Sequence, residues 1–424
     1  MSKSPPAGQS RAELPSYRQA AATVAAAARA ILQRSARTRT VNLASSLGSI
    51  LAEPVHTPFD MPAFPRSTRD GFAVRAAEAS AHRQLAIAGS IRAGDPPAGP
   101  LPPESAWEIM TGAAVPSGAD AVAMLEHVEN SGSSIRLSHK QTLDPGENMV
   151  GAAAEARAGD QLIPPGTRLS PAHIAAAATC GYARIKVFSR PRVAILTTGD
   201  ELVPVDAEPA AGQIRNSNAP MLAALVTLAG GDPWVLPAAS DSSEALDRAF
   251  SQAVQAPLML ISGGVSAGKF DLVEPALSRL GAQFHFTGVR IQPGKPLVFA
   301  EIPHGGKKAA TQVFGLPGNP ISSACTFLLF AAPILAALAG SCGVVPHFFA
   351  ARLSKPVKGK PSLTRFVPSI LRSAEKDGDL ASVAPVGTQG SGDLAAFARA
   401  NCFLAVPEGT ERLQEGEIVR ILAI

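Results

Sequence analysis

From residue 191 onward the sequence alternates between apolar strand-like runs and helix-like runs, and this pattern limits the fold more than any other feature. The strand-like runs are rich in Val, Ile and Leu. The first three pairs are RVAILTT (192–198) with SNAPMLAALVTLAGG (217–231), WVLPAA (234–239) with DSSEALDRAFSQAV (241–254), and PLMLIS (257–262) with DLVEPALSRLG (271–281). Apolar strands linked through amphipathic helices are typical of a doubly wound, mostly parallel sheet with helices on both faces. We therefore predict a central α/β domain.

The rest of the chain predicts domains of other kinds. A chain of 424 residues is too long for one core, at roughly 150 residues per domain. The alanine-rich residues 16–34 predict a long helix, and a series of prolines from Pro54 to Pro65 prevents its continuation. Short strand-like runs between turn signals extend to about residue 155, and others follow residue 345. Both regions are predicted to be mainly β.

Composition excludes several classes of protein. Apolar residues make up 46% of the chain and charged residues 17%, as in a globular protein. The net charge of +4 is spread along the chain, and only two Trp and two Tyr are present, so we expect no nucleic-acid partner. The four cysteines have no paired spacing, and the N-terminus lacks a secretory pattern. We expect a cytoplasmic protein.

One apolar segment raises the alternative of a membrane span. Residues 320–351 contain no Asp, Glu, Lys or Arg. However, Pro333, Gly340, Gly343 and Pro346 interrupt the segment, and no basic flank marks a cytoplasmic end. The sequence therefore predicts a buried core helix and no membrane partner.

Polar loops follow the predicted strands of the α/β domain. They are TTGDEL (197–202), Asp241, GGVSAGKFD (263–271), IQPGKP (291–296) and GLPGNP (315–320). Ligands of open parallel sheets bind outside the carboxyl ends of the strands. We therefore expect these loops to meet at one edge of the sheet and to form the binding site.

The loop GGVSAGKFD partly matches a phosphate-binding P-loop. Gly263, Gly268 and Lys269 have the P-loop spacing after a strand, but Phe270 stands where that motif needs Ser or Thr to hold Mg²⁺. A P-loop-like nucleotide hydrolase therefore remains an alternative. Gly263 and Gly264 still allow the backbone to approach an anion closely.

Prolines stiffen two further loops around polar side chains. Lys295 in PGKP is a point charge suited to phosphate or another oxyanion. Asn319 in LPGNP can donate and accept hydrogen bonds toward a heterocycle, and Ser322 stands at the start of the next helix. Each loop also has a simpler interpretation as a turn or helix cap.

Three carboxylates, Glu201, Asp241 and Asp271, are predicted near the same edge. Carboxylates that face a lysine beside an anion-binding loop suit Mg²⁺-assisted cleavage of a phosphoanhydride. Asp241 has a second interpretation as the N-cap of the helix that starts at Ser242.

Taken together, these motifs resemble those of the molybdopterin molybdenumtransferases, the MoeA family, and are also similar to the E domain of gephyrin. The resemblance includes RSTRDGFAVR (66–75), IMTGAAVPSGADAV (109–122) and QGSGDLAAFARANCFLAVPEG (389–409) in addition to the loops above. It implies a chain of four domains. These are domain I (15–53 plus 155–188, helical and extended), domain II (54–154, mostly β), domain III (189–342, α/β and molybdopterin-binding) and domain IV (343–424, β).

The resemblance also implies the reaction and the residues that perform it. Members of this family place molybdate on adenylylated molybdopterin, cleave its pyrophosphate-type linkage with a divalent cation, taken here as Mg²⁺, and release AMP. The implied catalytic residues are Glu201, Asp241, Asp271 and Lys295, with Asp241 and Asp271 as metal ligands. The implied substrate-binding residues are Gly263, Gly264, Ser266, Pro296, Pro317, Asn319, Pro320 and Ser322.

The family assembles as an elongated homodimer, so Asp70 and Thr111 are expected to reach the site from a second copy. Sequence position alone also allows a simpler interpretation, in which Asp70 is a turn residue before Gly71 and Thr111 ends a strand. A molybdopterin adenylyltransferase and molybdoenzyme acceptors are further candidate partners. The alternative to an enzyme is a non-catalytic, pterin-binding scaffold protein of the gephyrin type.

The sequence departs from the family pattern at two places. MVGAAAEARAGD (149–160) replaces a turn that is arginine-rich in many relatives. Gln292 stands where many relatives have Lys, so we expect a less basic pocket with lower affinity for molybdate.

Overall fold

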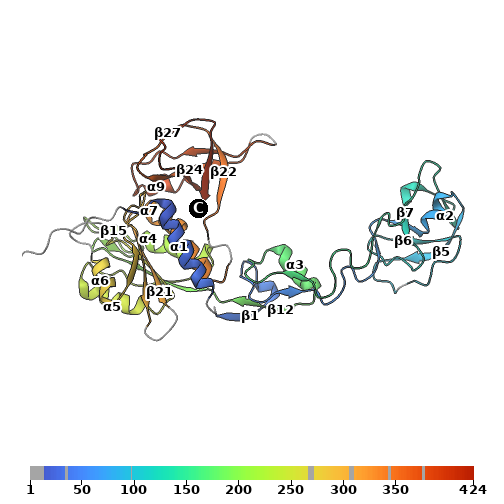
Figure 1. The fold of residues 1–424 in the computed structure, drawn as a ribbon, viewed down its shortest axis with the longest axis horizontal. Coiled ribbons are helices and arrows are strands. Elements are labelled where there is room, and N and C mark those ends of the chain that lie inside the picture. Colours follow the sequence, from blue (N-terminus) through green and yellow to red (C-terminus); the bar gives the residue numbers. More distant parts are fainter. Residues whose placement is uncertain are drawn as a thin grey trace, which may run out of the picture.

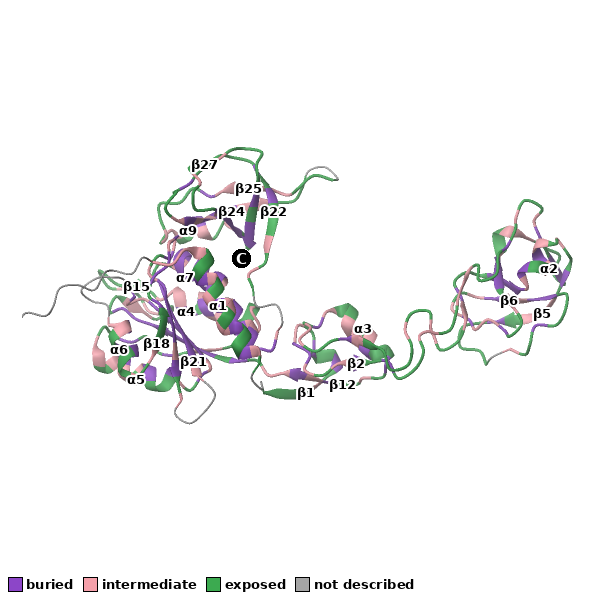
Figure 2. Cartoon of the chain, viewed as in Figure 1, coloured by how far each residue is buried: buried purple, intermediate pink, exposed green. Residues whose placement is uncertain are grey.

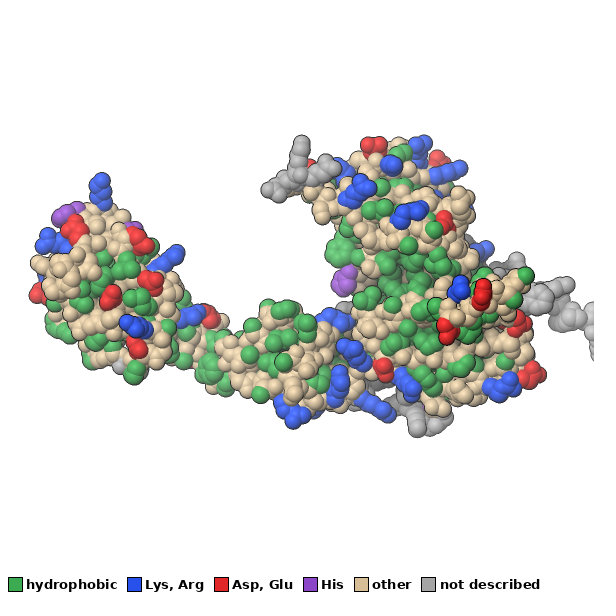
Figure 3. All heavy atoms as spheres, turned by 180° about the vertical axis from the view of Figure 1, so that it is seen from behind, with side chains coloured by type: hydrophobic (Ala, Val, Ile, Leu, Met, Phe, Trp, Pro, Cys, Tyr) green, Lys and Arg blue, Asp and Glu red, His purple; other side chains and the backbone are tan. Residues whose placement is uncertain are grey.

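A computed structural model describes residues 14–33, 37–96, 98–265, 272–304, 310–341, 345–374 and 378–424. The molecule is elongated: domains III and IV form one end, domain II forms the other, and domain I joins them (Figure 1). The space-filling view shows domain I as a narrow waist, with Lys and Arg side chains gathered where it meets domain III (Figure 3).

Domain III is built on a six-stranded sheet. In sheet order its strands are β16 (Asp232–Val235), β13 (Arg192–Thr197), β17 (Leu258–Ser262), β21 (Ala310–Leu316), β20 (Val298–Pro303) and β18 (Gln283–Phe286). The first four strands are parallel and β20 runs antiparallel to them, whereas β18 pairs antiparallel with β20 and so runs in the direction of the first four. The predicted doubly wound, mostly parallel α/β domain is confirmed.

Alternating residues of the sheet enter two cores. Val193 and Ile195 point to the face covered by α1 (Tyr17–Leu32), α4 (Asn218–Leu228), α7 (Pro320–Thr326) and α8 (Ala332–Leu338). Ala194 and Leu196 point to the face covered by α5 (Ser243–Ala253) and α6 (Val273–Arg279). The two-residue period of a strand explains why central strands buried on both faces read as continuous apolar runs. Figure 2 shows this buried sheet as the main concentration of buried residues.

The apolar segment after Pro320 is a core helix. Residues Pro320–Leu338 are long and apolar enough to cross a membrane, but 78% of their most apolar window is buried inside the protein. Between α7 and α8 the helix widens into a π-helical turn, η3 (Phe327–Ala331). The segment packs against α1 and the sheet, so the predicted buried core helix is confirmed.

Domain I holds a ribbon of two antiparallel strands, β1 (Thr38–Asn42) and β12 (Arg184–Phe188), with η1 (Leu43–Ser45) and α3 (Pro171–Thr179) beside it. The side chain of Ser170 caps α3, and Pro171 fits the first turn, where its missing N–H is not needed. Short antiparallel pairs carry the chain toward domain II: β2 (Val55–His56) with β11 (Gln161–Ile163), and β3 (Arg66–Ser67) with β10 (Met149–Val150).

Domain II has its own sheet and its own small cores, visible as a separate buried cluster in Figure 2. The strands in sheet order are β7 (Ala121–Met124), β4 (Gly71–Val74), β6 (Ser105–Ile109), β5 (Leu85–Ile91), β9 (Ser134–Leu137) and β8 (Val128–Asn130). The helix α2 (Ala76–Ser80) and the turn η2 (Leu125–His127) complete it.

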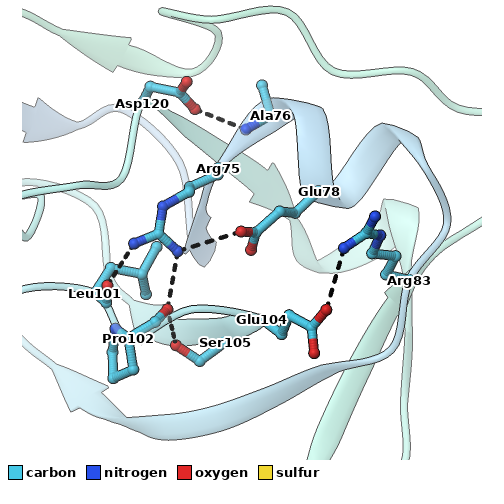
Figure 4. A network of polar contacts seen from close by, with 9 residues as sticks. All are labelled: Arg75, Ala76, Glu78, Arg83, Leu101, Pro102, Glu104, Ser105 and Asp120. Carbon is cyan, nitrogen blue, oxygen red and sulfur yellow. Dashed lines mark hydrogen bonds and ion pairs between the residues drawn. The ribbon is translucent and has the colours of Figure 1, made fainter.

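A polar network around Arg75 ties α2 of domain II to a proline-rich loop (Figure 4). The Arg75 guanidinium donates to the carbonyl oxygens of Leu101 at 2.6 Å and Pro102 at 2.9 Å, and it pairs with Glu78 at 3.5 Å. Asp120 accepts a hydrogen bond of 2.7 Å from the first backbone N–H of the helix. These charged hydrogen bonds add to the stability supplied by the two small apolar cores of domain II.

Domain IV is a second β unit that shares the core of domain III. Its sheet contains β19 (Ile291–Gln292), β24 (Thr364–Arg372), β25 (Ser382–Pro385), β22 (Phe348–Leu353), β28 (Ile418–Ala423) and β26 (Cys402–Val406), beside the pair β23 (Val357–Lys358) and β27 (Arg412–Leu413) and the helix α9 (Leu394–Phe397). The Tyr17 ring lies edge-on to Phe330 of domain III at 6.0 Å and to Phe366 of domain IV at 5.1 Å. These contacts fix the two domains against each other.

We expect Arg75→Ala to destabilise domain II by about 1–3 kcal/mol, because the Leu101 carbonyl loses a charged donor. Denaturant unfolding followed by Trp107 fluorescence in a Trp234→Phe background measures this domain alone, since the chain has only two Trp. Arg92→Ala is the matched control. Identical unfolding midpoints for the Arg75→Ala and Arg92→Ala variants would contradict the role of the network.

Candidate functional site

The site begins where three neighbouring parallel strands end. In the register of the sheet, Thr197 of β13 lies opposite Ser262 of β17, and Ser262 lies opposite Leu316 of β21. The loops TTGDEL, GGVSAGKFD and GLPGNP therefore leave the sheet at one level. The sequence prediction that these loops share an edge agrees with this register.

One predicted loop reaches that edge by a different route. The loop IQPGKP was predicted to follow a strand of the α/β sheet, but Ile291 and Gln292 form β19, which pairs with β24 in the sheet of domain IV. Lys295 instead precedes β20, whose first residue, Val298, lies opposite Gly315 near the end of β21. Because β20 is antiparallel, its beginning lies beside the carboxyl ends of the parallel strands. That expectation was therefore wrong about the strand, although the loop arrives at the expected edge.

The loops enclose a cavity of about 760 Å³. Predicted site residues that line it are Glu201, Asp241, Gly263, Gly264, Pro296, Pro317, Asn319 and Pro320. Residues of the wall that the sequence analysis did not single out include Thr198, Arg215, Asn216, Asn218 and Ser262. A cavity of this volume fits a small organic ligand.

A second cavity of about 330 Å³ adjoins the first and shares Pro296, Pro317 and Asn319 with it. Lys295 and Ser322 line this second cavity together with Arg365 and Ser391 of domain IV. The Asn319 side-chain amide donates to Ser391 Oγ at 2.8 Å, so it links the two domains in addition to facing the ligand space. Burial lowers the pKa of the Arg365 guanidinium.

Gly263 and Gly264 adopt backbone conformations that only glycine reaches without strain. Their φ angles are +98° and +64°. A Cβ atom on Gly263 would lie 2.6 Å from the Thr198 carbonyl oxygen, and one on Gly264 would lie 2.9 Å from a Val273 methyl group. Both glycines are therefore needed for this loop to pack against the TTGDEL loop.

The acidic loops bring like charges together. Burial is the main cause that raises the pKa of the Asp241 carboxyl, and the negative charges of Asp200 and Glu201 raise it further. A backbone hydrogen bond from Asp200 partly opposes this rise. The alternative interpretation of Asp241 as an N-cap is wrong, because Ser242 caps α5 by accepting from the Ala245 N–H at 3.3 Å. Asp241 is thus left to face the cavity.

The carboxylates fit a hard divalent cation. Mg²⁺ prefers oxygen ligands and is often bound by one or two carboxylates together with substrate phosphates. Glu201 and Asp241 supply such oxygens in one cavity, and their mutual repulsion favours a cation between them. No group of three or more His, Cys, Asp or Glu arranged to hold a metal occurs within the described residues. Ser266 and Asp271 lie outside those residues.

Asp70 and Thr111 lie together in domain II. The backbone N–H and the hydroxyl of Thr111 donate to Asp70 Oδ1 at 2.7 and 2.8 Å, and these bonds lower the pKa of Asp70. Neither residue lines the two cavities of its own chain, and domain II lies at the opposite end of the molecule (Figure 1).

Sequence reasoning missed two asparagines in the first cavity. Asn218 donates to Ser262 Oγ at 2.9 Å and to the Gly318 carbonyl at 2.6 Å, and Asn216 donates to Thr197 Oγ1 at 2.8 Å. They stand in the segment IRNSNAP (214–220), where Asn216 precedes α4 and Asn218 is its first residue. Two asparagines at a helix start that follows a strand were a usable signal, but the run from Ser217 was interpreted only as a helix.

Three family models match the chain in order. They are described as "MoeA N-terminal region (domain I and II)" over residues 16–181, "Probable molybdopterin binding domain" over 194–337 and "MoeA C-terminal region (domain IV)" over 350–424. Proteins named molybdopterin molybdenumtransferase from Nostoc sp. and Bacillus subtilis are each 36% identical to the chain, covering 91% and 92% of it and 89% and 91% of their own lengths. The chain belongs to the molybdopterin molybdenumtransferase family.

Solved structures agree with this membership. Two structures of the molybdopterin biosynthesis MoeA protein from Pyrococcus horikoshii each cover 97% of the chain. One is 32% identical with a TM-score of 0.73, and the other is 26% identical with a TM-score of 0.78. The predicted family, the multidomain fold and the enzyme class are confirmed.

Asp241→Asn is expected to raise the melting temperature at about pH 7.5. The pKa of Asp241 is raised in the folded state, so ionisation of its carboxyl at a pH above the ordinary carboxyl pKa destabilises the fold. The uncharged amide of an asparagine at this position does not carry that cost. The gain is expected to shrink as the pH falls toward about 4. Thermal unfolding across this range measures the effect, with the exposed Asp206→Asn as control. A lower melting temperature for Asp241→Asn at neutral pH would contradict the assignment.

Proposed function

We propose that the protein inserts molybdate into adenylylated molybdopterin, cleaves the linkage to the adenylate with Mg²⁺ and releases AMP, which completes the molybdenum cofactor. The observation that carries the proposal is the meeting of a glycine loop, two acidic loops and a lysine loop around two adjoining cavities. Family membership supports the same reaction class.

The two cavities suit the two parts of this chemistry. In the first, the bends at Gly263 and Gly264 allow a phosphate to approach the backbone, and the side chains of Asn216 and Asn218 stiffen the wall. In the second, Lys295 and Arg365 offer positive charge to an oxyanion such as molybdate. Arg365 pairs in register with Gln292, so domain IV supplies a cation beside this uncharged position.

The residues that would hold Mg²⁺ are Asp241, Glu201 and Asp271, the last of which lies outside the described residues. When bound, the cation would neutralise the charge that develops on the departing AMP. The chain's own contribution is to direct the Asp241 side chain into the cavity, to hold the phosphate at the glycine loop, and to balance the oxyanion with Lys295.

A homodimer would complete the site. The pair Asp70 and Thr111 is solvent-facing and cannot reach the cavities of its own chain in this arrangement, so we propose that it acts on the site of a second copy. We also propose a cytoplasmic location, with an adenylyltransferase as supplier and molybdoenzymes as acceptors. A P-loop-like hydrolase or a non-catalytic scaffold of the gephyrin type is not favoured, because the family matches name transferases.

Asp241→Ala is expected to leave the protein folded and to slow AMP release about 100-fold or more, because an acidic ligand beside the departing phosphate is lost. The assay mixes purified protein with adenylylated molybdopterin, molybdate and Mg²⁺ and measures AMP. Asp206→Ala, an exposed acid on a neighbouring loop, is the control. Binding without turnover by the unmodified protein would instead support the scaffold.

Mixing two inactive variants tests the shared site. Asp70→Ala and Asp241→Ala are each expected to be inactive, whereas a refolded mixture is expected to recover about a quarter of the normal activity, since half of the dimers carry one intact site. If the mixture stays as inactive as either variant, the two residues act within one chain or not at all.

A further inference from the structure

The loops that carry the site acids are joined by a side chain that lies outside the cavity wall. The TTGDEL loop follows β13, and the loop of Asp241 follows β16. Their backbones touch at the bridge between Thr198 and Ala239, and the Gly199 N–H donates to the Ala239 carbonyl at 3.4 Å. Beyond this bridge the Asp200 carboxylate accepts a hydrogen bond of 3.1 Å from the backbone N–H of Asp241.

Adjacent acids in the TTGDEL loop point in different directions. The Glu201 carboxyl folds back over Gly199, where a Cβ atom would lie 2.5 Å from Glu201 Oε2. The Leu202 N–H donates to the Gly199 carbonyl at 3.1 Å, so this turn holds Glu201 within its own loop. Glu201 lines the cavity, whereas Asp200 does not. Asp200 reaches across to the neighbouring loop instead.

Packing does not explain the position of Asp200. The residue is exposed and belongs to none of the buried cores. It also carries a negative charge toward Asp241, which costs stability unless another interaction offsets the repulsion. Asp200 is exposed, lies beside the acid Asp241 and accepts a hydrogen bond from the Asp241 backbone. A role in the site explains this arrangement better than a role in folding.

We propose that Asp200 is a positioning residue that fixes the backbone of Asp241, and so directs the Asp241 carboxylate into the cavity. The hydrogen bond is received from the N–H of Asp241 itself, one residue before the N-cap Ser242, so it acts at the point where the loop turns into α5. In other metal sites, mutation of a residue that hydrogen-bonds a ligand and so orients it lowers metal affinity or activity about 10- to 100-fold. This inference rests on the proposed function, in which Asp241 acts on the departing phosphate.

The test compares Asp200→Ala with Asp200→Asn in the full-length protein. The alanine removes the acceptor, whereas the asparagine oxygen can still accept from the Asp241 N–H. We expect Asp200→Ala to lower kcat for AMP release about 10- to 100-fold with little change in KM for adenylylated molybdopterin. We expect Asp200→Asn to retain most of kcat. Asp206→Ala controls for the loss of an exposed acid from a nearby segment.

A second readout is independent of turnover. Hydrogen–deuterium exchange of the peptide covering residues 239–245 is expected to rise in Asp200→Ala and to stay at the normal level in Asp200→Asn, without global unfolding of either variant. Normal kcat and normal exchange in Asp200→Ala would overturn the proposal. Equal loss of kcat in both variants with unchanged exchange would also overturn it, because charge rather than positioning would then be responsible.

The two readouts separate this inference from the proposed function. If the unmodified protein releases no AMP, the reaction assignment fails, while the exchange experiment still decides whether Asp200 holds the Asp241 loop. If the unmodified protein is active and Asp200→Ala behaves like it in both assays, only the positioning role fails.

Discussion

The structure depends on the register of three parallel strands. Because Thr197, Ser262 and Leu316 lie side by side in the sheet, the loops that follow them begin at one level and are forced together. This register is held by apolar side chains buried on both faces of the sheet, so the geometry of the polar site is set by the core beneath it.

Crowding acids and glycines at this edge has a cost in stability. Ionised Asp241 is disfavoured by burial and by two neighbouring carboxylates, and Gly263 and Gly264 hold conformations in which other residues would be strained. Sites that bind anionic ligands through a cation commonly keep such unfavourable arrangements, which become favourable when cation and ligand are present. The second cavity, with Lys295 and Arg365, has the opposite charge, so neighbouring parts of the site suit different parts of one reaction.

The alternation of short apolar strand runs with helix-length runs was sufficient to predict the central sheet, the shared edge and most of the loops that line it. Contacts that need a partner from elsewhere were not predictable. β19 leaves the α/β domain to join the sheet of domain IV, and Asn319 bonds Ser391, which is 72 residues away. The hydrogen bond from Asp241 to Asp200 likewise depends on the spacing of two strands, which no local pattern specifies.

A crystal structure of the protein with AMP and Mg²⁺ bound tests the central claim most directly, which is that one edge of the domain III sheet binds the nucleotide end of the substrate. We expect the phosphate at the loop of Gly263 and Gly264, with the cation between it and Asp241. A nucleotide bound away from this edge, or a cation held by none of the three proposed acids, would contradict the account.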